Sequence, residues 1–196
     1  LPAAVGMYFL AMPLTEVLFQ TGAFTMTDAH NTARVVEIYS VLMLFTSLSR
    51  ITSPAFYAMK NTWLPAAVAF FVLMLHIAVA PYFVDRFGLT GLATATSASS
   101  ILNIIVLQIF FYYWIGPLGY GSIFMSALKM VPGLAAMAAF CHYAFPYLRP
   151  LTGRTLALTL VILGSMIIYF GVTVLSGSEA GQRVLGVFRR RLSRRN

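Results

Sequence analysis

An arginine inside an apolar stretch is the first residue whose type and position indicate chemistry. Arg50 lies about eight residues, or roughly 12 Å of helix, from the end of a hydrophobic run over residues 35–58. A charge at that depth is costly and usually faces a cavity or a partner. Pro54 removes a backbone donor one turn later and can kink the helix there. Arg50 is therefore a candidate for lining an anion-handling cavity; the alternative is an arginine that snorkels or is paired structurally.

A second candidate is a polar stripe in the apolar run over residues 91–114. Thr96, Asn103 and either Ser99 or Ser100 recur there at helical spacing. Small residues every four positions in the same run, beginning at Gly91, would let a neighbouring backbone approach closely. The stripe is either a substrate or ion site or a set of helix-to-helix hydrogen bonds. Both interpretations place that face toward the protein interior.

The remaining ionisable residues are weaker candidates. Lys129 lies one to two turns into an apolar run, where its long stem can reach headgroups, and Glu16 lies near the end of another. The histidines are isolated and have no acidic residue at ligand spacing, which favours packed or interfacial roles (His30, His76, His142). Sequence motifs of hydrolases, nucleotide-binding enzymes and metalloproteases are missing. We therefore expect no catalytic residue, no metal and no cofactor.

The composition indicates the elements that must position these side chains. The 196 residues are 60% hydrophobic and 9% charged, whereas soluble domains carry about 25% charged residues. Because a helix needs roughly 20 apolar residues to cross a bilayer, the hydropathy pattern predicts six transmembrane helices. Their apolar runs lack the alternation of a β-barrel strand. The predicted spans are residues 3–20, 35–58, 63–84, 91–114, 123–146 and 155–175.

Short connections with turn residues separate the predicted spans. Thr27 followed by Asp28 predicts a helix start after the first connection. Residues 85–88 and 149–153 are expected to be loops because they contain glycine, proline or charged residues. Pro13 in the first span and Pro132 in the fifth predict flexible points.

The arginines predict the orientation in the membrane. Six of the 13 basic residues stand in the last 14 positions, so the net charge of +8 is local and does not indicate nucleic-acid binding. Because basic residues accumulate on the cytoplasmic side, six spans place both ends of the segment in the cytoplasm, together with Lys60. The predicted tail, residues 177–196, is either a basic surface helix that binds anionic headgroups or a disordered positive tail.

Several segments resemble the MurJ/MviN lipid II flippases. Residues 13–25, Pro-Leu-Thr-Glu-Val-Leu-Phe-Gln-Thr-Gly-Ala-Phe-Thr, are similar to a family signature in which a span ends before an acidic residue, here Asp28. Residues 53–58 resemble the family's Phe-Tyr-Ala segment, which contains Tyr57, and residues 91–95 resemble a Gly-Leu-Ala span start. The matches follow the family order and cover about residues 1–110 well; beyond them only the hydropathy pattern agrees.

The resemblance implies the last six of fourteen spans of a two-lobed transporter. It divides the chain into residues 1–114, four helices of the second lobe, and residues 122–176, two helices forming a groove for a lipid tail. It implies a cationic cavity for a polyprenyl diphosphate, with Arg50, Tyr57, Thr96 and Asn103 as the local candidates. Some members bind sodium through an Asn and an Asp that are missing from the matching residues 76–80, so no metal site is expected.

The function predicted on these grounds is translocation of lipid II across the bacterial inner membrane by alternating access. The other partners would be an amino-terminal lobe of the same protein and anionic lipids at the tail. One alternative is a flippase for another polyprenyl-linked saccharide. A second is a membrane scaffold that does not transport and recruits partners through its arginine tail.

Overall fold

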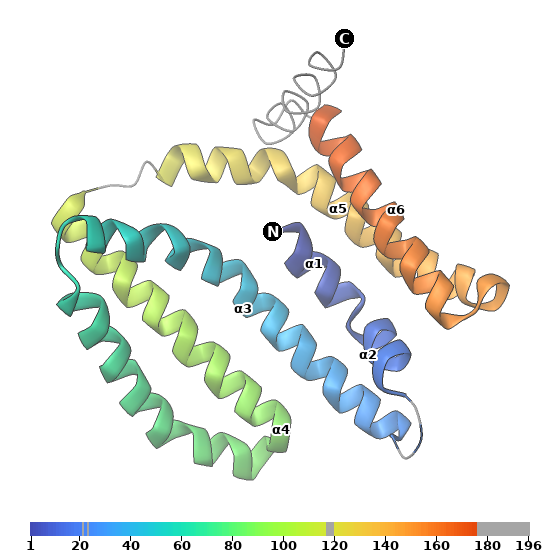
Figure 1. The fold of residues 1–196 in the computed structure, drawn as a ribbon, viewed down its shortest axis with the longest axis horizontal. Helices are drawn as coiled ribbons and strands as arrows, with labels where there is room; N and C mark the ends of the chain where they lie inside the picture. Colours follow the sequence, from blue (N-terminus) through green and yellow to red (C-terminus); the bar gives the residue numbers. More distant parts are fainter. Residues whose placement is uncertain (21, 23, 117–119, 176–196) are drawn as a thin grey trace. The chain divides into compact units, whose positions relative to one another are not determined.

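A computed structural model describes residues 1–20, 22, 24–116 and 120–175 of the chain. These residues form helices without a β-strand, in the order α1 (Pro2–Phe9), α2 (Ala11–Phe19), α3 (Met26–Ala58), α4 (Trp63–Ile115), α5 (Tyr120–Thr152) and α6 (Arg154–Leu175) (Figure 1). They fall into two units: Leu14–Leu118, and Pro2–Pro13 with α5 and α6. The predicted all-helical class is confirmed.

The helix α3 begins at a capping box. Thr25 is the N-cap, its side chain accepts from the Asp28 backbone N–H at 3.3 Å, and its own N–H donates to the Asp28 carboxylate at 3.0 Å. The predicted start at Thr27 is therefore two residues too late, because Thr25 rather than Thr27 lies three residues before the acidic side chain, whereas the predicted place of Asp28 in the first turn is confirmed. The helix then continues through Pro54 to Ala58.

The helix α4 contains two of the predicted spans. Its backbone leaves the helical region at Gly88, where φ is 59° and ψ is −136°, and Figure 1 shows the two halves of α4 running back along each other. The predicted loop at residues 85–88 is wrong in extent, since within α4 the backbone is non-helical at Gly88 alone. Glycine tolerates this positive φ because it has no Cβ. A second glycine, Gly91, allows the close return, because a Cβ there would overlap the Phe83 carbonyl.

The pairing of α3 with α4 is centred on aromatic side chains near the end of α3. Phe56 is fully buried and meets Phe111 edge to face, with ring centroids 5.8 Å apart. Leu107 completes this cluster, and Leu64 from the start of α4 packs against it. The end of α3 and both ends of α4 therefore meet at this cluster.

The first predicted span is divided into two helices. The axes of α1 and α2 differ by 68° across Leu10. Pro13 explains the break: it has no N–H to donate to the carbonyl of Phe9, four residues earlier, and its ring crowds that carbonyl. The break therefore falls one turn before the proline that was expected to be a flexible point.

In the second unit, α5 and α6 form a closely packed hairpin joined by Gly153 alone, with φ of 82°. The predicted loop at residues 149–153 is thus wrong in extent: helical structure extends through Pro150 to Thr152, and only Gly153 connects the helices. Glycines bring the helices together: a Cβ at Gly133 would lie 2.6 Å from the Thr173 hydroxyl, and one at Gly164 would lie 2.8 Å from the Phe140 ring. The helix α1 also packs against α5.

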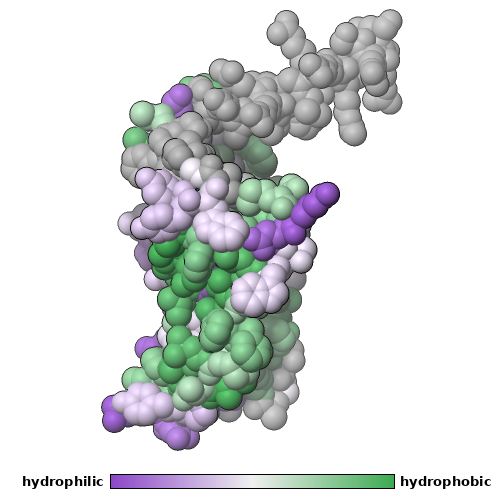
Figure 2. All heavy atoms as spheres, turned by 90° about the vertical axis from the view of Figure 1, so that its left-hand side faces the viewer, coloured by the Kyte–Doolittle hydropathy of each residue, from purple (hydrophilic) through white to green (hydrophobic). Residues whose placement is uncertain are grey.

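Large apolar side chains remain exposed along all these helices, as a lipid environment requires. On the side shown in Figure 2, hydrophobic side chains cover most of the middle and hydrophilic ones lie toward the ends. Four helices in the described residues are long and apolar enough to cross a membrane, or five if α1 and α2 form one span. Dividing α4 at Gly88 makes this count compatible with six spans. The predicted tail, residues 177–196, lies outside the described residues.

Candidate functional site

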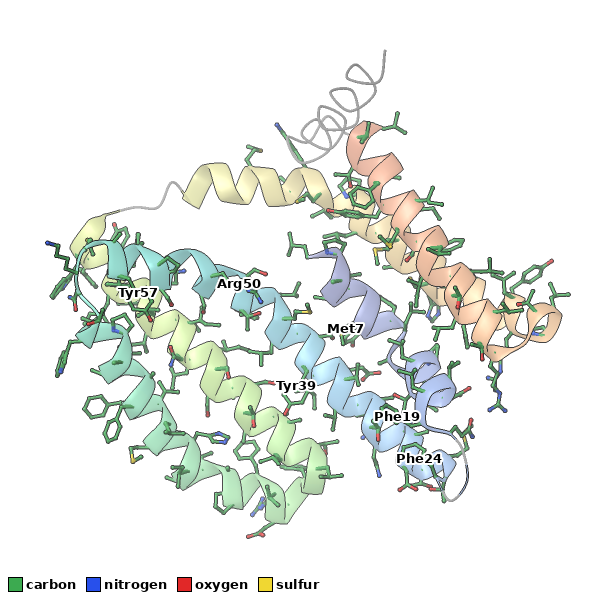
Figure 3. The ribbon with its side chains drawn as sticks, in the orientation of Figure 1. Met7, Phe19, Phe24, Tyr39, Arg50 and Tyr57 are labelled. Atoms are coloured by element: carbon green, nitrogen blue, oxygen red, sulfur yellow. The ribbon has the colours of Figure 1, made fainter. Side chains whose placement is uncertain are left out.

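Arg50 lies on the side of α3 that faces away from α4. Thr52 is buried and accepts a hydrogen bond from the Gln108 amide of α4 at 2.7 Å. Arg50 precedes Thr52 by two residues, which is about 200° around a helix, and its side chain is exposed (Figure 3). No described carboxylate forms an ion pair with Arg50. The guanidinium is therefore available to an anionic group from outside this segment.

Tyr57 shares this exposed face. It follows Arg50 by seven residues, so the two side chains leave the helix in directions that differ by only about 20°. Of the Tyr57 surface, 52% is exposed. The neighbouring Phe56 is buried in the α3–α4 contact instead. Two of the predicted site residues, Arg50 and Tyr57, are therefore brought onto one helix face.

Thr96 and Asn103 lie on a different face, in the second half of α4. Both are half-buried, and their spacing of seven residues places them on one side of that helix. The Thr96 hydroxyl donates to the Leu92 carbonyl of its own helix at 2.8 Å. The side of α3 that bears Arg50 is not the side that contacts α4, so the four candidates do not form a single cluster.

Two cross-helix hydrogen bonds in this unit involve polar side chains that the sequence analysis did not pair. His76 Nδ1 lies 3.2 Å from the Ser99 hydroxyl and links the two halves of α4, which agrees with a packed histidine and a hydrogen-bonding stripe. The Gln108–Thr52 bond was not predicted. A signal for it existed, since a lone glutamine in the apolar run over residues 104–111 indicates a partner on another helix.

The two weaker candidates lie elsewhere. Glu16 is on α2 and only 7% of its surface is exposed, so this carboxyl is enclosed by protein and is not a surface charge. Lys129 is exposed on α5, in the second unit. Within the described residues, no group of three or more His, Cys, Asp or Glu side chains is placed to hold a metal ion. What the candidate site offers chemically is the positive charge of Arg50, which can bind an anion.

Comparison with known proteins decides the family. The family model described as "Lipid II flippase MurJ" matches residues 1–170. The chain belongs to the MurJ lipid II flippase family. A probable lipid II flippase MurJ of Bdellovibrio bacteriovorus is 34% identical over 186 residues, which are 93% of this chain and 35% of that relative. This segment therefore spans about a third of the length of the curated MurJ relatives it matches.

Further MurJ relatives match a shorter part. A probable lipid II flippase MurJ of Buchnera aphidicola is 36% identical over 108 residues, which are 55% of this chain and 21% of that relative. A lipid II flippase MurJ of Thermosipho africanus is 30% identical over 107 residues, which are 55% of this chain and 22% of that relative. The family match to residue 170 shows that the expected limit near residue 110 was too narrow: α5 and most of α6 are also MurJ-like.

Proposed function

We propose that this segment is the carboxyl-terminal part of a flippase that carries lipid II across the bacterial inner membrane by alternating access. Membership of the MurJ family and the names of the matched relatives support this substrate. The amino-terminal lobe of the same protein would supply the rest of the cavity, and both ends of the segment would face the cytoplasm. The predicted tail would bind anionic lipid headgroups.

The observation that carries the proposal is the position of Arg50. It stands within a membrane helix, exposed on the face opposite to the packed helix. Hydrocarbon is an unfavourable environment for a guanidinium, so this face of α3 belongs toward the other lobe and the transport path. A diphosphate suits such a position because it accepts several donors of a permanently charged guanidinium.

The other candidates take secondary places in this proposal. Tyr57 lines the same path at the Lys60 end of α3, and Thr96 and Asn103 support the second half of α4, where lobes that rock against each other need polar contacts. Residues 1–114 belong to the second lobe, and the two helices within residues 122–176 form a groove for the polyprenyl chain. Glu16 and Lys129 have no assigned contact with the substrate.

Complementation of a strain depleted of its lipid II flippase tests the proposal. We expect the full-length parent protein to restore growth and lipid II transport. Arg50→Gln should lower transport roughly tenfold or more, because a charge-assisted hydrogen bond contributes about 1.5–3 kcal/mol, and Arg50→Lys should retain part of it. Arg34→Gln is the matched control, since Arg34 is also an exposed arginine of α3 but lies before the predicted span.

Each result separates the alternatives. A correctly inserted parent that fails to rescue growth would contradict lipid II as the substrate and favour another polyprenyl-linked saccharide. Equal activity of the parent and Arg50→Gln would contradict the placement of the diphosphate. Loss of function on deletion of residues 180–196 alone, with normal insertion, would favour the scaffold alternative.

A further inference from the structure

The exposed face of α3 carries a second tyrosine on the far side of Arg50. Tyr39 precedes Arg50 by 11 residues, which is three turns of helix to within about 20°, and Tyr57 follows it by two turns. The surfaces of Tyr39 and Tyr57 are 39% and 52% exposed. Figure 3 marks all three residues along α3. The face thus holds one cation between two aromatic side chains.

These tyrosines differ from the aromatic residues that anchor membrane proteins at the lipid interface. Interfacial tyrosines face lipid, but a face that also carried Arg50 into lipid would expose a guanidinium to hydrocarbon, which is costly. Because all three side chains share one face, the argument that turns Arg50 toward the transport path turns both tyrosines toward it as well. The opposite side of α3 is occupied by α4, through the Thr52–Gln108 bond and the burial of Phe56.

The rings of Tyr39 and Tyr57 are also available to a ligand. Within the described residues neither side chain forms a ring contact or a hydrogen bond. A tyrosine offers an apolar ring face and a hydroxyl at its tip, which together match a pyranose, with its C–H faces and its rim of hydroxyl groups. The two rings stand about 16 Å and 10 Å along the helix from Arg50. These spans exceed the length of one sugar, so a saccharide of at least two sugars, together with the extended arginine side chain, would be needed to bridge them.

We propose that Tyr39 and Tyr57 are two saccharide platforms on either side of a diphosphate anchor at Arg50. The inference rests on the proposed function and adds specificity to it: Arg50 recognises the diphosphate, whereas the tyrosines recognise the sugars linked to it. At the Lys60 end, Tyr57 packs against the sugar when the cavity is open to that side. Tyr39 packs against it when the cavity is open to the Met26 end. The saccharide thus exchanges one aromatic ring for another while the diphosphate stays near mid-membrane.

Binding of two ligands that differ only in the saccharide tests this assignment. The full-length protein in nanodiscs is titrated with lipid II and, separately, with undecaprenyl diphosphate, which lacks sugars. Tyr39→Ala and Tyr57→Ala should each weaken lipid II binding roughly tenfold, which corresponds to about 1.4 kcal/mol, and change undecaprenyl diphosphate binding less than about twofold. Tyr57→Trp should restore lipid II binding, because it replaces one aromatic face with another. Arg50→Gln should weaken both ligands.

An exposed tyrosine that lies on another helix is the matched control. Tyr113 near the end of α4 is 78% exposed, and Tyr113→Ala should leave both affinities unchanged. Equal effects of Tyr39→Ala, Tyr57→Ala and Tyr113→Ala on lipid II affinity would overturn the platform assignment. So would a loss of affinity that is the same for lipid II and undecaprenyl diphosphate in Tyr39→Ala or Tyr57→Ala, because it would show that the tyrosine has a structural role. If the unsubstituted protein binds lipid II more tightly than undecaprenyl diphosphate, those results overturn this inference and leave the proposed function standing. Failure of the unsubstituted protein to bind lipid II overturns the proposed function and this inference together.

Discussion

The pairs α3–α4 and α5–α6 are both built from apolar membrane helices, yet they are held together differently. The first uses side-chain hydrogen bonds between helical segments, Thr52 with Gln108 and His76 with Ser99, beside a small aromatic cluster. The second relies mainly on close approach at Gly133 and Gly164, beside a hydrogen bond between the Cys141 and Ser165 side chains. Lipid tails are as apolar as the helix surfaces, so the hydrophobic effect does not favour helix association within the bilayer. Membrane helices associate instead through interhelical hydrogen bonds and through close packing at small residues.

The difference teaches where a polar ligand can be accommodated. Contacts that depend on backbone proximity tolerate little change in helix separation, because interiors are close-packed. A pair joined by a few polar side chains leaves other helix faces free to carry functional groups, and α3 carries Arg50 on such a face. The separation of α5 and α6 is therefore set by backbone contact, whereas α3 carries the exposed arginine that we propose for substrate recognition.

The largest effect is expected at the turn within α4, because there the obstacle is backbone. Gly91→Ala would place a methyl group on the Phe83 carbonyl, and the hairpin must open to admit it. We expect a loss of about 3 kcal/mol in the free energy of unfolding, at the upper end of overpacking effects. Unfolding of the purified protein by SDS titration in mixed micelles measures it.

Gly171→Ala provides the control for this change. No atom lies within 4 Å of the position that a Cβ at Gly171 would occupy, so alanine there should be neutral or stabilising by less than about 1 kcal/mol. Equal stability of Gly91→Ala and Gly171→Ala would show that the halves of α4 do not approach as closely as described.

Sequence reasoning found the membrane helices but misplaced their ends, and the residues explain why. Hydropathy located the apolar runs, whereas the boundaries depend on single atoms: the Thr25 hydroxyl that caps α3, the missing N–H of Pro13, and the absent Cβ of Gly88. Hydropathy averages over many residues and does not register such contributions.

The candidate site was predictable to a similar degree. The depth of Arg50 in an apolar run identified it as a candidate, and the match in spacing of Tyr39, Arg50 and Tyr57 is present in the sequence alone. Which side of α3 meets α4 depends on long-range packing. Only the Thr52–Gln108 bond and the buried Phe56 show that the Arg50 face is the open one.

The second effect tests close packing between α5 and α6. A Cβ at Gly133 would lie 2.6 Å from the Thr173 hydroxyl and 3.4 Å from the Tyr169 carbonyl, so Gly133→Ala should destabilise the hairpin by about 2 kcal/mol. In Gly133→Ala/Thr173→Ala the hydroxyl is removed, and about 1 kcal/mol of that loss should be recovered. Buried Cys141, on α5, is a local reporter, because its reaction with a maleimide requires the hairpin to open. Strictly additive effects would contradict direct contact between the two positions.

The smallest effect is expected for the hydrogen bond between Thr52 of α3 and Gln108 of α4. A double-mutant cycle with Thr52→Val and Gln108→Leu should give a coupling energy of about 1 kcal/mol, because hydrogen bonds between membrane helices contribute little net stability. SDS unfolding of the four proteins supplies the cycle. Thr46→Val replaces Thr52→Val in a control cycle, since the Thr46 hydroxyl donates to the Met43 carbonyl of its own helix at 3.0 Å and should not couple to Gln108. A coupling as large for Thr46 as for Thr52 would show that the glutamine acts on α3 as a whole. A coupling confined to Thr52 would show that this one bond fixes the rotation of α3, and with it the direction in which Arg50 points.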